Sequence, residues 1–348
     1  MTERLPVTEA GLSRAAELLR SGGLVAFGTE TVYGLGADAT DSHAVARIFA
    51  AKGRPDFNPL ISHFASAADA FAHVQATPIA ETLARRFMPG PLTLVMTRRA
   101  DGAICDLATS GLPTAAVRVP GHETALTLLR AVGRPVAAPS ANLSGSVSPS
   151  DADHVLDGLE GRIDAVLDSG PCSVGVESTV LDISGPNPVL LRHGGVPLEA
   201  IEAEIGPVLL DAPDEPSAPR SPGQLSSHYA PSLPLRLNAT DIEPDEALLA
   251  FGPASRSSNL CWNLSESGDL EEAAARLFAG LRHLDAEGRK RGLKRIAAAP
   301  VPSHGLGAAI GDRLARAAAP RPPHPHMPPP PSDASPREAA STCRHEAL

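Results

Sequence analysis

Short apolar runs alternate with segments of helical periodicity through residues 8–205, which limits the chain to folds that pack helices on a sheet. Two of the runs, residues 177–183 and 188–192, lie so close together that we expect them to pair as antiparallel neighbours. A sheet in which all strands are parallel cannot contain such a pair. The sequence therefore predicts an α/β domain with a mixed sheet covered by helices, and not a purely parallel doubly wound sheet.

The pattern changes after residue 205. Residues 206–234 are rich in proline and lack periodicity, which is typical of a linker. A second, smaller α/β pattern runs over residues 235–319 and includes a predicted helix at 269–286. Residues 320–348 contain many prolines and few apolar side chains, so we expect this tail to be disordered.

Charge and composition exclude several classes of protein. The chain has 30 Lys and Arg against 40 Asp and Glu, and its net charge of −10 disfavours non-specific coating of nucleic acid. Its start lacks the apolar core of a signal peptide, and no apolar stretch is long enough to span a membrane. The four cysteines lie far apart and form no CxxC pair. We therefore expect a cytoplasmic protein.

A compact set of anion-binding side chains lies in residues 52–63. Lys52 and Arg54 come at the end of a predicted helix, and Asn58 and His63 follow within a few residues. Arg suits bidentate recognition of phosphate or carboxylate, and Lys provides a point charge. A solvated helix end, where cations complement the dipole, explains Lys52 and Arg54 equally well. His63 by itself is more typical of a hydrogen-bonded core histidine than of a ligand.

Two loops could approach a small ligand. The first, residues 29–40, carries hydroxyls and glycines that allow close approach of the backbone. The second, residues 138–150, is rich in hydroxyls such as Ser140 and Ser148 and could hold a nucleotide. Ordinary connecting loops and turns have the same composition, so both explanations stay open.

Arg118 follows an apolar run and is expected to be largely buried. A buried cation needs a partner, because an unpaired one costs several kcal/mol. That partner is either a structural carboxylate or the carboxylate of a substrate. No P-loop, no Ser-His-Asp order and no paired-carboxylate pattern is present in the sequence. An enzyme built from these residues would bind and position anions with little covalent participation.

Several segments together resemble the threonylcarbamoyl-adenylate synthase family, the YrdC/Sua5 proteins: TETVYGLG, KGRPDFNPL, AVRVP, APSANLSG, GVESTV and LLRHG. This resemblance spans residues 10–205. The segment SPGQLSSHYAP at 221–231 resembles the linker of the longer Sua5 form, and residues 305–318 resemble the end of its small C-terminal domain. The resemblance implies an open, twisted mixed sheet with helices, a large positively charged cavity and a Rossmann-like second domain.

The resemblance also implies a reaction. L-Threonine, bicarbonate or CO2, and ATP with its Mg²⁺ would be joined into threonylcarbamoyl-adenylate, with release of pyrophosphate. No protein-bound metal is expected. The product would pass to the machinery that makes N6-threonylcarbamoyladenosine at position 37 of tRNAs reading ANN codons, and a contact with tRNA or double-stranded RNA stays open.

The resemblance assigns roles to individual residues. The residues on the threonine side are Thr31, His63, Arg118, Ala138 (through its backbone) and Ser178. The residues on the ATP side are Arg54, Asn58, Thr114, Ser140, Ser148, Arg192 and Tyr229. Lys52 and Arg54 would neutralise phosphate charge during catalysis, and Tyr229 would close over ATP as part of a lid. The chain departs from the family pattern at Gly28 and at Gln224-Leu225, where proline and a basic residue, respectively, are common.

Two other classes remain as alternatives. A double-stranded-RNA binding module is disfavoured by the acidic net charge and by residues that only a threonine pocket requires. A carbamoyl-transfer domain of the hydrogenase-maturation type would be expected to follow acylphosphatase and zinc-finger segments, whereas this sequence opens on its first predicted helix.

Overall fold

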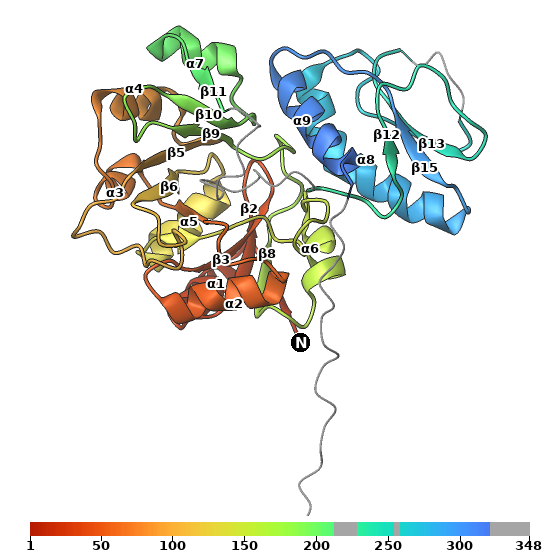
Figure 1. Ribbon diagram of the computed structural model, residues 1–348. Coiled ribbons are helices and arrows are strands. Elements are labelled where there is room, and N and C mark those ends of the chain that lie inside the picture. Colours follow the sequence, from red (N-terminus) through yellow and green to blue (C-terminus); the bar gives the residue numbers. More distant parts are fainter. Residues whose placement is uncertain (212–227, 254–257, 321–348) are drawn as a thin grey trace, which may run out of the picture.

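The computed structural model describes residues 1–211, 228–253 and 258–320, which form two α/β domains side by side (Figure 1). Most of the predicted linker and the predicted tail beyond residue 320 lie outside these ranges. Within them, no helix has the length and apolar character needed to cross a bilayer.

A mixed sheet forms the centre of the first domain, and within the described residues it has eleven strands. Their spatial order is β1 (Glu3–Pro6), β8 (Ala165–Asp168), β2 (Val25–Gly28), β3 (Tyr33–Asp38), β7 (Val136–Ala137), β4 (Ile61–His63), β6 (Thr114–Arg118), β5 (Leu92–Thr97), β9 (Thr179–Asp182), β10 (Val189–Arg192) and β11 (Leu209–Leu210). β9 and β10 are antiparallel, with Leu181 opposite Leu190, as predicted. The mixed α/β class is therefore confirmed, and the sheet extends beyond the predicted limits of 8–205 at both ends.

Helices cover both faces of this sheet: α1 (Glu9–Arg20), α2 (Ser42–Lys52), α3 (Ala67–Phe71), α4 (Pro78–Phe87), α5 (Glu123–Val132), α6 (Ala152–Leu159) and α7 (Leu198–Ile205). Alternate residues of β2 point to opposite faces. Val25 and Phe27 pack in a cluster with α1 and α5, whereas Ala26 packs in the cluster that contains α2. The Thr8 hydroxyl caps α1 by accepting a hydrogen bond from the Gly11 amide at 3.2 Å.

The prediction of a loop over residues 29–40 is wrong for its second half, because Tyr33–Asp38 form β3. β3 pairs antiparallel with β2, so that Gly36 lies opposite Val25. Glycine is normally a sign of a loop, but here it is required by packing. A Cβ atom on Gly36 would lie 2.9 Å from the Phe27 ring and 3.0 Å from Val136.

Replacing Gly36 with alanine is therefore expected to lower the free energy of unfolding by about 1–3 kcal/mol, because the added methyl overpacks a closed core. Gly158 in α6 is a matched control, since its nearest neighbour for a Cβ lies at 4.0 Å. Gly158→Ala should leave stability unchanged or raise it by up to about 1 kcal/mol. Urea unfolding followed by circular dichroism measures both. Equal stability of Gly36→Ala and the wild type would contradict the packing explanation.

The second domain has a parallel sheet in the order β12 (Leu235–Arg236), β15 (Arg295–Ala298), β13 (Glu246–Ala250) and β14 (Cys261–Asn263), with helices α8 (Leu270–Lys290) and α9 (Leu306–Ala318). This all-parallel sheet with helices agrees with the Rossmann-like expectation. The predicted helix at 269–286 forms and continues to Lys290.

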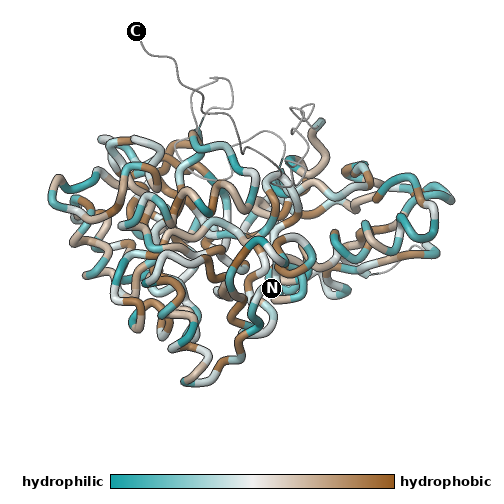
Figure 2. Tube along the Cα trace, turned by 90° about the horizontal axis from the view of Figure 1, so that it is seen from below, coloured by the Kyte–Doolittle hydropathy of each residue, from teal (hydrophilic) through white to brown (hydrophobic). Residues whose placement is uncertain are grey.

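The two domains share a hydrophobic core. Val32, Val147 and Val176 of the first domain belong to the same buried cluster as Leu277 and Ile310 of α8 and α9. Figure 2 shows the domains as two adjoining lobes, in which hydrophobic stretches lie between hydrophilic ones. The second domain is thus docked on the first by apolar contact.

Candidate active site

A small polar cavity of about 40 Å³ lies between residues of the first domain and the His228–Tyr229 segment. Its lining consists of Val32, Arg54, Ile61, His63, Arg118, Ala138, Pro139, Ser140, Glu177, Ser178, Arg192, His228 and Tyr229. Ile61 and His63 are two residues apart in β4 and so point to the same face. His63 is paired in register with Arg118 at the end of β6, which brings these two side chains together.

Arg118 is buried and forms an ion pair with Glu30. Its Nη2 donates to Oε1 of Glu30 at 2.6 Å and to the Thr31 hydroxyl at 2.9 Å. The structural carboxylate, one of the two partners considered from the sequence, is therefore present. Among the described residues Nη1 of Arg118 has no hydrogen-bond partner, and the side chain still lines the cavity. Arg118 can consequently bind a second anion while it keeps Glu30.

His63 is neutral at physiological pH. Burial, with a smaller contribution from the charge of Arg118, lowers the pKa of His63 to about 3. Its Nδ1 lies 3.2 Å from the carbonyl oxygen of Ile61, and its ring meets Phe27 edge to face. The imidazole can therefore take part in a hydrogen bond with a ligand without adding charge.

Ser178 and Arg192 form the side of the cavity next to β9 and β10. Arg192 donates to the Ser178 carbonyl from Nε at 3.1 Å and from Nη2 at 2.9 Å, and Nη2 also lies 3.1 Å from the Ser178 hydroxyl. That hydroxyl is 2.7 Å from the hydroxyl of Thr93. These bonds fix the Ser178 side chain at the cavity wall.

Arg54 reaches the cavity from the segment after α2. Its Nε and Nη2 donate to the carbonyl oxygens of Asn58 and Pro59 at 3.3 and 3.1 Å. Together with Arg118 and Arg192 it gives the described part of the lining three guanidinium groups, against the one carboxylate of Glu177. Such a charge favours phosphate and carboxylate groups.

Lys52 is buried beside the cavity but is not one of its lining residues. Its Nζ donates to the carbonyl oxygens of Ser140 and Asn142, and so holds the 138–150 loop in place. Burial, and to a lesser extent the charge of Arg54, holds the pKa of Lys52 well below its usual range. The phosphate-neutralising role of Lys52 stays a prediction.

The structure brings most of the predicted site residues together. Those that line the cavity are Arg54, His63, Arg118, Ala138, Ser140, Ser178, Arg192 and Tyr229. Thr31 and Ser148 lie one hydrogen bond behind it, on Arg118 and on Glu177. Asn58 contacts Arg54 through its carbonyl, and Thr114 lies at the start of β6 opposite Thr97, away from the lining. The ligand assigned to each residue remains a prediction.

Sequence reasoning missed Glu177, which is the one carboxylate in the lining formed by the described residues. Its Oε1 accepts from the Ser148 hydroxyl at 2.6 Å and its Oε2 from Nε of Arg313 at 2.9 Å. Burial alone would raise the pKa of Glu177, but the charges of Arg313 and Arg192 lower it to about 2. Glu30 was also missed. The only sequence signal for it was its position in the TETVYG segment, which carries part of the family resemblance.

Tyr229 closes the cavity from the described end of the predicted linker. Its side chain is 1% exposed, its ring stacks on Phe278 of α8 at 5.5 Å, and its φ of +62° lies in the left-handed region. Non-glycine residues rarely adopt that conformation and tend to do so at functional sites. His228 packs edge-on against the ring at 4.1 Å and also lines the cavity.

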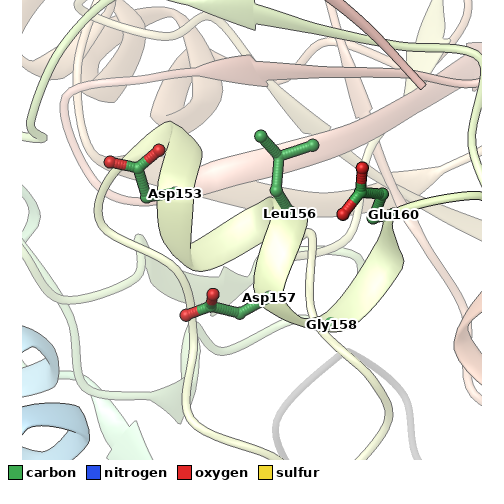
Figure 3. A pocket seen from close by; sticks show the side chains of 5 residues that line it. All are labelled: Asp153, Leu156, Asp157, Gly158 and Glu160. Carbon is green, nitrogen blue, oxygen red and sulfur yellow. The ribbon is translucent and has the colours of Figure 1, made fainter. Parts of the chain in front are cut away.

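A larger hollow of about 440 Å³ beside α6 has the opposite character (Figure 3). Asp153, Asp157 and Glu160 contribute its charged side chains, all of them negative. Phosphate groups would be repelled there. Across residues 1–211, 228–253 and 258–320, no group of three or more His, Cys, Asp or Glu side chains is placed to hold a metal ion.

Comparison with known proteins bears on the polar cavity. A family model for Sua5, YciO and YrdC proteins, described as telomere recombination, matches residues 17–194, and one for the threonylcarbamoyl-AMP synthase C-terminal domain matches residues 196–319. The chain is 41% identical to threonylcarbamoyl-AMP synthase from Bacillus subtilis, over 91% of this chain and 96% of the relative. The chain belongs to the Sua5/YrdC family of threonylcarbamoyl-AMP synthases.

Another Sua5/YrdC relative, from Pyrococcus abyssi, is 42% identical over 87% of this chain and 92% of its own length. The crystal structure of Pyrococcus abyssi Sua5 complexed with L-threonine matches with a TM-score of 0.83 at 40% identity, over 91% of this chain and 97% of that one. The resemblance found in the sequence is thus confirmed, and membership of the family makes the chain a transferase of the nucleotidyltransferase type.

Proposed function

We propose that this chain condenses L-threonine, bicarbonate or CO2, and ATP into threonylcarbamoyl-AMP, with release of pyrophosphate. The observation that carries this proposal is the single cavity in which Arg118 and the neutral His63 lie near the cations Arg54 and Arg192. It offers one place for an amino acid carboxylate and another for phosphates, side by side. The Pyrococcus abyssi structure is named as a complex with L-threonine, which supports threonine as a substrate.

On the threonine side, Nη1 of Arg118 would bind the carboxylate while Nη2 stays on Glu30 and Thr31. A charge-assisted bond of this kind is among the strongest that a side chain makes. His63 would face the rest of the amino acid without an added charge that would repel its ammonium form. Ser178 and the Ala138 backbone would complete this subsite.

On the ATP side, Arg54 and Arg192 would hold the phosphates, and Ser140, Ser148 and Tyr229 would contact the nucleoside. The threonine amine adds to bicarbonate or CO2 to give a carbamate, with loss of water in the case of bicarbonate. A carbamate oxygen then attacks the α-phosphorus, and the bond from this phosphorus to the bridging oxygen breaks to release pyrophosphate. The protein would act by orientation and charge neutralisation.

Mg²⁺ would enter with ATP and supply charge neutralisation on the phosphates. Both oxygens of Glu177 are taken by Ser148 and Arg313, so this carboxylate is poorly placed to bind a cation directly. The basic lining suits a metal that arrives already bound to phosphate. The residues that would hold the Mg²⁺-ATP complex are Arg54 and Arg192, through the phosphate oxygens.

The present volume of about 40 Å³ holds water but not ATP, so the His228–Tyr229 segment would move to admit the nucleotide and then close over it. Closure would exclude water from the mixed anhydride and protect it from hydrolysis. The product would then serve transfer of the threonylcarbamoyl group to N6 of adenosine 37 in tRNAs that read ANN codons.

Incorporation of label tests this proposal. Purified protein is incubated with ¹⁴C-bicarbonate, Mg²⁺-ATP and L-threonine, and the nucleotide product is separated and identified by its mass. We expect labelled threonylcarbamoyl-AMP only when both threonine and ATP are present. Absence of such a product from a folded protein that binds both substrates would contradict the proposed reaction.

A further inference from the structure

Helix α9 lies on the side of the second domain that faces the first domain (Figure 1), and it carries the charged residue Arg313. Arg313 is completely buried, and its Nε donates to Glu177 of the first domain at 2.9 Å. Its Nη1 donates to the carbonyl oxygen of His193 at 2.6 Å and to Asp312 at 2.8 Å. Arg313 is therefore bonded to the segments just before β9 and just after β10, which border the cavity.

Glu177 continues this contact into the cavity. The carboxylate lines the cavity and accepts from Ser148 on its other oxygen at 2.6 Å. A chain of two charge-assisted hydrogen bonds thus runs from the second domain to a hydroxyl on the proposed ATP side. Because the Ser148 hydroxyl donates to Glu177, it presents only lone pairs to a ligand.

Arg313 also supports the residue that closes the cavity. Its guanidinium lies 5.4 Å from the centre of the Tyr229 ring, within the range of a cation–π contact. Close packing leaves little freedom here, since a Cβ atom on Gly175 would lie 2.4 Å from the Ala274 carbonyl of α8. One side chain of the second domain therefore contacts both Glu177 and Tyr229.

Stability alone is a poor explanation for this arrangement. A buried ion pair often stabilises a fold no more than well-packed apolar side chains of the same size would. Within the described residues, Nη2 of Arg313 is buried without a hydrogen-bond partner, which adds a further cost. A role in the neighbouring site explains the buried charge better than stability does.

We propose that Arg313 is a positioning residue of the ATP subsite, which fixes the Glu177 carboxylate at the cavity wall and supports the Tyr229 ring when its segment closes over nucleotide. The inference rests on the proposed function for the identity of the nucleotide. Under this inference, the second domain contributes a residue that supports the ATP subsite. Arg313 makes no hydrogen bond to Arg118 or His63, both described residues proposed to bind threonine, so we expect the effect to be confined to ATP.

The test uses the full chain with Arg313→Gln, Arg313→Lys, Glu177→Gln and the Arg313→Gln/Glu177→Gln double variant. Arg276→Gln is the matched control, since Arg276 lies on α8, is partly exposed, and contacts Glu272 and the Trp262 ring, neither of which lines the cavity. Calorimetry measures ATP and threonine affinity, and pyrophosphate release measures kcat and KM. Thermal unfolding confirms that each variant is folded.

We expect Arg313→Gln and Glu177→Gln each to weaken ATP binding by about 10-fold or more, with threonine affinity within about 3-fold of the wild type. The double variant should bind ATP no more than about 3-fold more weakly than the weaker-binding single variant does, because the double variant leaves no unpaired buried charge. Arg313→Lys should recover part of the loss, and Arg276→Gln should behave as the wild type.

ATP affinity within 2-fold of the wild type in folded Arg313→Gln, or a double variant whose loss equals the product of the two single losses, would overturn the inference. If Arg313→Gln does not fold, ATP affinity within 2-fold of the wild type in both Glu177→Gln and Arg313→Lys would overturn the inference. ATP affinity is measured without turnover, so a wild type that binds ATP but forms no threonylcarbamoyl-AMP refutes the proposed reaction and leaves this inference to be judged separately.

Discussion

Replacing Arg118 with alanine is expected to weaken L-threonine binding by about 10- to 150-fold and to remove product formation at low threonine concentration. The lost charge-assisted hydrogen bond corresponds to about 1.5–3 kcal/mol. The loss becomes larger if the threonine carboxylate is left buried without a partner. ATP affinity should change little, because Arg118 is not among the residues proposed to contact the nucleotide. Calorimetry with each substrate separately measures both effects.

The Arg118→Ala variant is also expected to be less stable, and a double variant with Glu30 controls for this effect. Removing Arg118 leaves Glu30 as an unpaired buried carboxylate, which is expected to lower stability by about 3–5 kcal/mol. The double variant Arg118→Gln/Glu30→Gln removes both charges and should regain most of the stability without regaining threonine affinity. Arg99→Ala, whose partner Asp101 is exposed, is the surface control. A folded double variant with wild-type threonine affinity would contradict the role given to Arg118.

Replacing Tyr229 with alanine is expected to weaken ATP binding by about 10-fold or more and to lower the free energy of unfolding by about 3–5 kcal/mol. The ring fills the space between Phe278 and Arg313, and its loss leaves a hole at the top of the cavity. The opened cavity should also hydrolyse more ATP without forming product. Threonine affinity should change much less.

Tyr229→Phe separates the ring from the hydroxyl, because it keeps the stacking and the contact with Arg313. We expect it to retain most of the stability and to reveal how much of the ATP affinity comes from the hydroxyl. Isotope-labelled ATP, followed to AMP and to threonylcarbamoyl-AMP, measures productive against unproductive turnover. Wild-type ATP affinity and product yield in a folded Tyr229→Ala variant would show that this segment only joins the domains.

Local signals in the sequence were sufficient for most of the fold. Helical periodicity over residues 269–286 predicts most of α8, and the short separation of two apolar runs predicts the β9–β10 pair. Such elements are determined by neighbours along the chain. β3 was missed because Gly36 is required by its packing against Phe27 and Val136, which local periodicity does not reveal.

The cavity could be predicted only in part, for a related reason. The segments that supply Arg54, His63, Arg118 and Arg192 were recognisable one by one. The pairs that fix them were not, since Glu30 and Arg118 are 88 residues apart and Glu177 and Arg313 are 136 residues apart. Partners at such separations are set by tertiary packing. The same sequence pattern therefore left the carboxylate partner of Arg118 open.

Threonine-dependent exchange between ATP and pyrophosphate tests the central claim most directly. Pyrophosphate labelled with ³²P is incubated with the protein, ATP, Mg²⁺ and bicarbonate, with and without L-threonine, and the label in ATP is counted. Formation of threonylcarbamoyl-AMP at this site predicts exchange that requires threonine and bicarbonate and is strongly reduced in Arg118→Ala. Exchange that proceeds equally without threonine, or no exchange in a protein that binds both substrates, would contradict it.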